Sequence, residues 1–140
     1  MGIRYEWADD HKIILDIYLE TPWTWVEYND NLKVIMPMLR DLKYPCATTV
    51  NTSKMGSIPN DGNVLENLIG VEKNMPDNVF ASAIIAAPYV ISVFMNILMR
   101  VRPRAQRLAL FTSTPQEAHQ KIYARYRELY PDLAEKIANQ

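Results

Sequence analysis

The sequence feature that most constrains the fold is a run of 21 residues without a formal charge, from Val79 to Met99. About 20 consecutive apolar residues are enough to cross a bilayer as one helix. Here Pro88 divides the run, and proline suits the first turn of a helix but disrupts its interior. The first part, Val79–Ala87, is short and rich in branched and small apolar residues, as in a strand buried on both faces. We therefore predict a strand followed by a helix in a small soluble α/β domain, not a membrane span.

The composition agrees with this interpretation and excludes several functional classes. The chain has 140 residues, the length of one domain, and its 15 basic and 16 acidic residues leave a net charge of −1. The basic excess typical of nucleic-acid binding is therefore missing. The single cysteine, Cys46, excludes an internal disulfide and is expected to be a small buried apolar residue. The opening sequence MGIRYEWADDHK has charges where a signal peptide needs an apolar core, so we expect a cytoplasmic protein.

Strands and helices are expected to alternate along the rest of the chain. Strands are predicted at 3–7, 12–19, 46–50, 79–87 and 107–111, and helices at 24–42, 63–74, 88–101, 114–129 and 132–139. The first two strands form an antiparallel hairpin, and the apolar odd-numbered positions of the second face inward. Polar residues 51–62 form an irregular loop, and residues 103–106 form a turn. This order predicts a single domain, 1–140, with a five-stranded, mixed but mostly parallel sheet and helices packed on it.

The helix at 24–42 has the clearest local signal in the chain. Thr24 followed by Glu27 is a capping box, in which each side chain can accept a hydrogen bond from a backbone N–H at the helix start. Trp23 and Tyr28 are spaced as a hydrophobic staple across that cap. Pro37 lies inside the helix and is predicted to kink it, because proline removes one backbone hydrogen bond.

Three stretches carry a resemblance to a known family: Ile3–Trp7, the helix entry Pro22–Trp25, and Ala86–Phe111 with the capping sequence Thr114–Glu117. With the order of elements, they resemble the STAS domain, the fold shared by anti-sigma-factor antagonists and the cytoplasmic ends of sulfate transporters. More narrowly, the chain is similar to small bacterial proteins of that class. The resemblance implies a non-enzymatic regulatory or protein-interaction module with a protein partner, which the sequence does not identify.

In the antagonists, the family implies a serine that a partner kinase phosphorylates at the start of the helix after the third strand. A phosphate there changes the charge of a docking surface and meets free backbone N–H groups. The matching segment, 58–63, contains no serine, and Asn60 or Asp61 is expected to cap the helix instead. Ser53 and Ser57 lie nearby in the predicted loop. This difference argues against a phosphorylation switch of that type, while the four residues stay candidate partner-binding residues.

The helix at 88–101 is more apolar than one buried face requires. Tyr89, Ser92, Asn96 and Arg100 form its narrow polar stripe, at about 100° per residue. The other sides are either covered by neighbouring helices or form a contact surface for a homodimer, another protein or an acyl chain. The candidate contact residues on this helix are Phe94, Met95 and Met99.

Four arginines follow closely at the end of this helix: Arg100, Arg102, Arg104 and Arg107. One interpretation is that a helix C-terminus stabilises these cations, each by roughly 0.3–1 kcal/mol. The other is a binding site for an anionic group, on a protein partner or on a lipid headgroup at peripheral membrane contact. We take the first three of these arginines as candidate binding residues.

Three aromatic residues, Trp23, Trp25 and Tyr28, gather at the entry to the helix at 24–42. They are expected either to belong to the staple and the core or to line a pocket. The second interpretation supports an alternative function, the binding of a small hydrophobic ligand or lipid in apolar space beside this helix and the helix at 88–101.

Signals for catalysis, metals and cofactors are missing from the sequence. His11 and His119 have no partner at a spacing that suits a zinc site. The chain has no glycine-rich phosphate motif and no GxSxG motif, and Cys46 has no adjacent base. We therefore expect no enzymatic activity, no metal and no cofactor.

Overall fold

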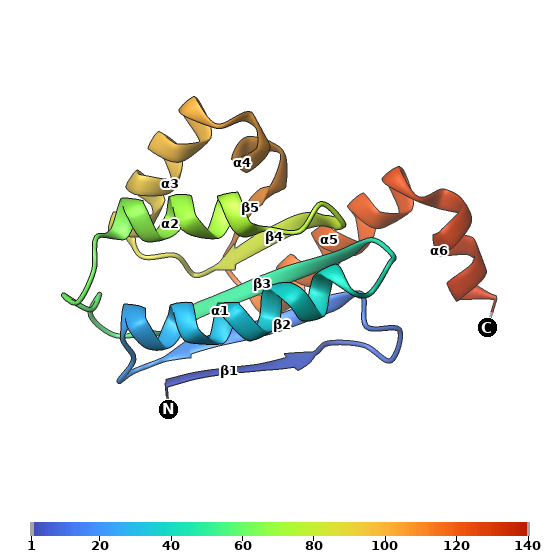
Figure 1. Ribbon diagram of the computed structural model, residues 1–140. Coiled ribbons are helices and arrows are strands. Elements are labelled where there is room, and N and C mark those ends of the chain that lie inside the picture. The colour runs from blue at the N-terminus through green and yellow to red at the C-terminus, as the bar shows by residue number, and fades with distance from the viewer. Residues whose placement is uncertain (1, 140) are drawn as a thin grey trace.

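The strands lie in the sheet in the order in which they occur in the chain (Figure 1). The computed structural model describes residues 2–139. The strands are β1 Gly2–Trp7, β2 Ile14–Glu20, β3 Cys46–Lys54, β4 Val79–Ile85 and β5 Ala109–Thr112. β1 pairs antiparallel with β2, and the remaining pairs are parallel. The predicted fold class, a mixed and mostly parallel five-stranded α/β sheet, is confirmed.

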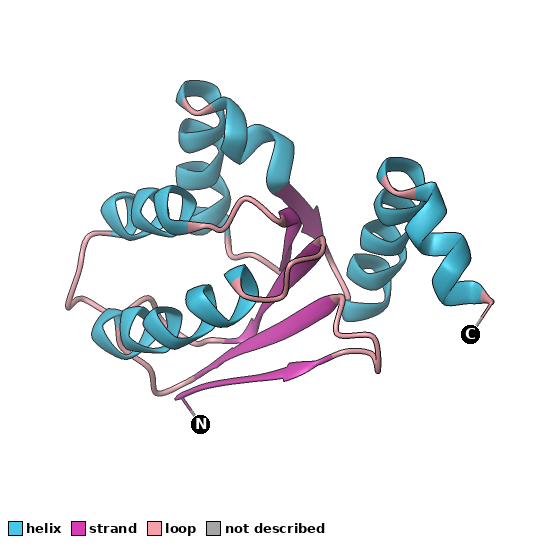
Figure 2. Cartoon of the chain, turned by 45° about the vertical axis from the view of Figure 1, so that its right-hand side comes forward, coloured by secondary structure: helices cyan, strands magenta, loops and turns pink. Residues whose placement is uncertain are grey.

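Helices cover both faces of the sheet (Figure 2). They are α1 Trp25–Arg40, α2 Val64–Asn74, α3 Tyr89–Val101, α4 Pro103–Leu108, α5 Pro115–Leu129 and α6 Pro131–Ala138. Each parallel strand is added on the same side of the previous one, and right-handed crossovers then place α1 to α4 together on one face. α5 follows the last strand and packs on the other face with α6.

The uncharged run divides as predicted. β4 ends at Ile85, and α3 begins at Tyr89 after Pro88, whose backbone is extended. Within residues 2–139, no helix combines the length and the apolar character needed to cross a membrane. Cys46 is buried at the start of β3, as expected, and burial raises the pKa of its thiol to about 12.

The strand β2 is buried on both faces, which corrects the prediction of a single inward face. Leu15, Ile17 and Leu19 pack in the core beneath α1. On the other face, Ile14 packs against α5. The alternation of apolar and polar residues was misleading because Asp16, a polar residue, is also buried.

Two further predicted boundaries were wrong. β3 continues through Asn51 to Lys54, where a loop was predicted, because Asn51 pairs with both neighbouring strands. The segment predicted as a turn and the start of a strand is instead α4, which begins with Pro103 at its first position. β5 therefore begins at Ala109 rather than Arg107.

The Thr24 half of the capping box predicted for α1 is confirmed, and among the described residues no hydrogen bond joins the Thr24 N–H to the Glu27 side chain. The Thr24 side chain accepts a hydrogen bond from the Glu27 backbone N–H at 3.0 Å. The rings of Trp23 and Tyr28 make an edge contact, with centroids 6.1 Å apart. Both interactions fix the angle at which the chain enters the helix.

The caps predicted for α2 are corrected. Asn63, not Asn60 or Asp61, caps α2, and its side chain accepts the Glu66 N–H at 3.0 Å. Asp61 instead caps α1, where its carboxylate accepts the N–H groups of Trp25 at 2.9 Å and Val26 at 3.1 Å. These hydrogen bonds lower the pKa of Asp61. The loop before α2 is thereby tied to the start of α1.

Candidate functional site

A cavity of about 100 Å³ lies between the sheet and the helices α1, α2 and α3. Its floor includes Val50 of β3 with Ser82 and Ile84 of β4, which point toward these helices. All three are only half-buried, although helices cover this face of the sheet. Protein interiors rarely contain voids much larger than a water molecule. The half-buried floor therefore marks space that the core leaves unfilled.

Apolar side chains from α1, α2, α3 and two loops form most of the walls, and Ala105 and Leu108 of α4 complete them. The aromatic residues Trp23, Trp25 and Tyr28 come from the start of α1, Leu68 and Val71 from α2, and Ile91, Met95 and Leu98 from α3. Met55 and Met75 line the cavity from the loops after β3 and α2. Methionine side chains are unbranched and adapt readily to the shape of a neighbour. The cavity thus has a rigid aromatic wall and a more adaptable remainder.

The three aromatic residues at the start of α1 contact one another edge to face. The ring centroids of Trp23 and Trp25 lie 5.0 Å apart, and those of Trp25 and Tyr28 lie 5.8 Å apart. The Trp23 indole N–H donates to the Met55 carbonyl at 2.9 Å. The predicted pocket residues are therefore brought together, and the same contacts also serve the core, so both sequence interpretations describe part of this cluster.

Polar groups interrupt the apolar lining at a few points. The Ser82 hydroxyl accepts a hydrogen bond from Thr48 at 3.0 Å. The Thr52 hydroxyl donates to backbone carbonyls at the end of β4, at 2.8 Å and 2.9 Å. Burial raises the pKa of Tyr28 to about 12, so its hydroxyl keeps its proton at neutral pH. Sequence reasoning missed Ser82 and Thr52, because only the strand register shows that they face the cavity.

Arg102 and Arg104, predicted to bind a partner, hold the end of α2. Arg102 forms an ion pair with Glu72, a buried residue that lines the cavity. Arg104 donates to the carbonyls of Glu72 at 3.2 Å and Pro76 at 3.0 Å, and also to that of Met75. Cations at a helix C-terminus are stabilised by the dipole and the free carbonyl groups. That interpretation fits these two arginines, although the helix is α2 rather than the one preceding them.

The other residues predicted on α3 separate between its two sides. Met95 lines the cavity, while Phe94 and Met99 are half-buried and Arg100 is exposed. A further apolar set on the outer side of α3 is exposed: Tyr89, Val90, Ile97 and Val101. Sequence periodicity had placed Tyr89 in a polar stripe and did not single out the others. α3 thus presents apolar side chains both to the cavity and to solvent.

The candidates around the third strand do not form a cluster. Ser53 lies at the exposed end of β3, and its hydroxyl donates to Asn51 at 2.7 Å. Ser57 and Asn60 are exposed in the following loop. Asp61 caps α1 as described above. Among residues 2–139, no hydrogen bond joins these four candidates to one another, and none of them lines the cavity.

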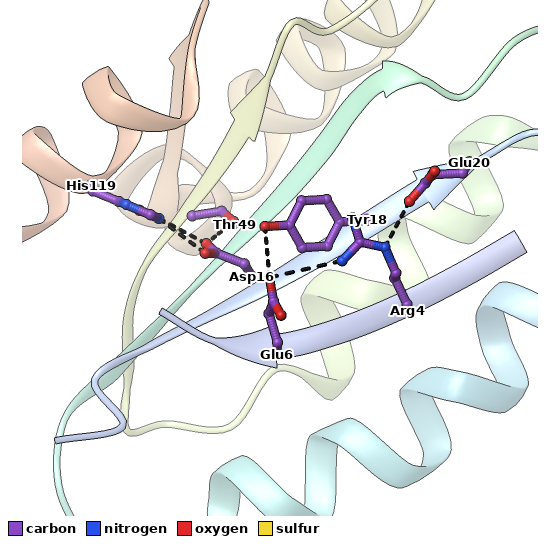
Figure 3. Close-up of polar contacts among 7 residues, drawn as sticks. All are labelled: Arg4, Glu6, Asp16, Tyr18, Glu20, Thr49 and His119. Atoms are coloured by element: carbon purple, nitrogen blue, oxygen red, sulfur yellow. Dashed lines mark hydrogen bonds and ion pairs between the residues drawn. The ribbon is translucent and has the colours of Figure 1, made fainter. Parts of the chain in front are cut away.

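The opposite face of the sheet carries a separate polar group of side chains (Figure 3). The buried Asp16 accepts a hydrogen bond from Thr49 at 2.6 Å and contacts Nε2 of His119 at 2.9 Å. His119 lies 103 positions further along the chain, so nothing in the local sequence indicated this pair. Asp16 thus has partners on both sides within the fold.

Beside Asp16, polar side chains of β1 and β2 extend across the same face (Figure 3). Arg4 pairs with Glu20 at 2.8 Å and lies over the ring of Tyr18 at 3.8 Å. The Tyr18 hydroxyl donates to Glu6 at 3.2 Å. These groups use one another as partners, so we assign the row a structural role. Within the described part of the chain, no three histidine, cysteine or acidic side chains are arranged to hold a metal ion.

Comparison with known proteins adds no relative to this description. No protein-family model matches the chain, and no curated protein or solved structure matches it. The resemblance to the STAS domain therefore stays a prediction. The α/β fold and the cavity between its sheet and helices are the observations on which a function must be argued.

Proposed function

We propose that this protein is a non-enzymatic binding module that takes a small apolar ligand into the cavity between the sheet and α1, α2 and α3. The observation that carries the proposal is the apolar volume of about 100 Å³ beneath these helices. An engineered apolar cavity of about 150 Å³ stays dry and binds benzene or xenon. A ligand of comparable or slightly smaller size is therefore the natural occupant. We keep the cytoplasmic location predicted from the sequence as part of this proposal.

The energy of an empty cavity supports this function. Unfilled core volume lowers stability by about 24 cal/mol per Å³. For a cavity of about 100 Å³ this is about 2.4 kcal/mol. Natural domains are stable by only about 5–15 kcal/mol, so the loss is a substantial fraction. A ligand that fills the space restores apolar contacts there, which gives binding and stabilisation one common cause.

The methionine methyl groups offer a direct test. Met55, Met75 and Met95 line the cavity, whereas Met38 and Met99 lie outside it. With ¹³C-labelled methionine methyl groups, titration with benzene or cyclopentane is expected to shift the NMR signals of the first three. The signals of Met38 and Met99 serve as controls. Unchanged spectra, or equal shifts at all methionines, would contradict the proposal.

A second measurement asks whether the protein already carries a ligand. Native mass spectrometry of freshly purified protein is expected to show the chain with a bound small molecule, which denaturing conditions release. A protein that shows only its bare mass, and that also gives no methyl shifts with the probes, does not bind apolar ligands in this cavity.

The exposed side of α3 favours a second function, the regulatory or protein-interaction role implied by the STAS resemblance. We propose a second copy of this chain as the partner. Its supporting observation is that Val90, Ile97 and Val101 expose apolar surface on one side of α3, next to Tyr89, so two such faces can meet symmetrically. Light scattering at micromolar concentration is expected to give twice the chain mass for the wild type and the chain mass for Val101→Glu. A wild-type monomer would refute this role for α3.

A further inference from the structure

At the α1 end of the cavity, two polar groups have no protein partner. Trp25 is 3% exposed, and its indole Nε1 has no hydrogen-bond acceptor among the described residues. Tyr28 is 7% exposed, and no described residue hydrogen-bonds its hydroxyl. The neighbouring Trp23 shows the usual arrangement, since its indole N–H donates to a carbonyl. Most buried polar side-chain atoms in proteins have such a partner, so the buried Trp25 indole N–H without one requires an explanation. The Tyr28 hydroxyl is a second donor on the same wall that no described residue pairs with.

We infer that the ligand is an uncharged, mostly apolar molecule with one hydrogen-bond acceptor, such as a carbonyl oxygen, that binds Tyr28 and Trp25. This inference rests on the proposed function and defines the ligand class for the same cavity. Trp25 and Tyr28 are three residues apart on one helix, so their side chains lie on the same face. Their ring centroids are 5.8 Å apart in an edge contact, so both residues belong to the same part of the cavity wall.

The chemistry of the two groups selects an acceptor rather than a donor. An indole N–H can only donate. The Tyr28 hydroxyl stays protonated at neutral pH, because burial raises its pKa to about 12, and can therefore also donate. A hydrocarbon leaves both groups unpaired, and a buried donor without a partner is costly. An acceptor-bearing ligand supplies the missing partner.

The charges on the wall argue that this acceptor is neutral. Among the described residues that line the cavity, the charged side chain is Glu72, which is buried and paired with Arg102. A carboxylate ligand would bring a second negative charge into apolar surroundings without a cation of its own. A ketone, aldehyde, ester or amide carbonyl supplies the acceptor without that charge.

Access to the indole requires a small local movement. No water-sized space touches Nε1 in this structure. Gly62 packs against the same edge of the ring, since a Cβ at this position would lie 3.2 Å from Cδ1 of Trp25, the atom beside Nε1. Water is therefore excluded from the N–H. A ligand group reaches it when this edge of the Trp25 ring moves away from Gly62, and the adaptable Met55 and Met95 side chains on the cavity wall give the ring room to move.

A pair of isosteric probes tests the inference. Cyclopentanone and methylenecyclopentane have nearly the same shape, but only the ketone has a strong acceptor. We expect the ketone to bind the wild type and to move the ¹⁵N–H NMR signal of the Trp25 indole, with the signal of Trp7 as the internal control. In Tyr28→Phe and Trp25→Phe, the affinity for the ketone relative to the alkene is expected to fall roughly three- to tenfold, the effect of one neutral hydrogen bond. Methyl shifts of Met95 confirm that both probes occupy the cavity.

The outcomes separate this inference from the proposed function. If both probes shift Met95 equally in wild type and variants, and the Trp25 indole signal stays in place, the cavity binds apolar ligands and the inference is overturned. If neither probe binds, the proposed function itself fails. Should either variant not fold, the indole signal of the wild type with each probe still decides, because a shift with the ketone alone supports the inference and equal shifts refute it.

Discussion

Replacing Val50 by isoleucine adds one methylene group to the floor of the cavity. Val50 lies at the centre of β3, where it pairs with Ile17 of β2 and Ile84 of β4. It remains half-buried because the cavity lies above it. Isoleucine is also β-branched and suits a strand as well as valine does. The added group therefore enters empty space without a change in backbone preference.

The expected effect is a gain in stability of about 1 kcal/mol. Burial of one methylene contributes about 0.8 kcal/mol. The empty volume of about 100 Å³ lowers the free energy of unfolding by roughly 2.4 kcal/mol, and partial filling of the cavity recovers some of this loss. Urea denaturation measures the difference, with an unchanged slope of free energy against denaturant as the sign of a simple stability change. The melting temperature should rise by roughly 3 °C.

The matched control is Val34→Ile on the exposed side of α1, where the same methylene meets solvent. We expect its free energy of unfolding to stay within about 0.5 kcal/mol of the wild type. A fall of about 1–3 kcal/mol in Val50→Ile would indicate overpacking of a core that is already full. That result would refute the reasoning, because it would mean that the space above Val50 does not exist in solution.

Three other substitutions test the contacts that shape the site. Asp61→Ala is expected to lower the melting temperature, because two N–H groups at the start of α1 lose their acceptor. Folding lowers the pKa of Asp61, so the contribution of its carboxylate to stability is fully present above the ordinary carboxyl pKa and is lost as the pH falls through the lower folded-state pKa. If the difference in melting temperature between variant and wild type stayed the same in strong acid, this explanation would be contradicted. Arg102→Met leaves the buried Glu72 unpaired and should therefore reduce the free energy of unfolding, measured in urea, by about 2 kcal/mol. This value is discounted for the partial exposure of Arg102. Adding Glu72→Leu to the same chain should restore most of the loss. Lys43→Gly should increase the free energy of unfolding by up to about 1 kcal/mol and raise the melting temperature, because Lys43 has a φ of 63° that glycine adopts more easily. A lower melting temperature would count against this explanation.

The elements that local interactions determine were predictable from the sequence. Proline at 88 and the capping signals at Thr24 and Thr114 act within a few residues of themselves, and each is found where it was expected. The alternation of strands and helices then limits the topology to parallel crossovers. The five-stranded sheet follows from those rules.

Features that depend on pairing between distant segments were not predictable. The polar residues at the end of β3 predicted a loop, but pairing with the strands on both sides extends β3 through Asn51. Asp61 was assigned to the helix that follows it, whereas the tertiary fold places it at the start of α1. The pairing of Asp16 with His119 likewise depends on α5 returning to the sheet. Local propensity is a weak guide where such long-range contacts decide.

The candidate site shows the same division. Trp23, Trp25 and Tyr28 are close in sequence, and their gathering could be anticipated from helical spacing. The cavity wall opposite these three residues, which includes Met95 of α3, was anticipated only as apolar space beside the helices at 24–42 and 88–101. Ser82 reaches the site through the register of β4 with β3, which a single sequence does not contain. The cavity is thus a property of the assembled layers rather than of any one motif.

The measurement that tests the central claim most directly is a crystal structure of the protein under xenon pressure. Xenon binds in apolar cavities and needs no hydrogen bond, so it reports the space itself. We predict ordered xenon among the side chains of Val50, Leu68 and Met95. Well-diffracting crystals in which these side chains meet and no xenon lies between them would contradict the account.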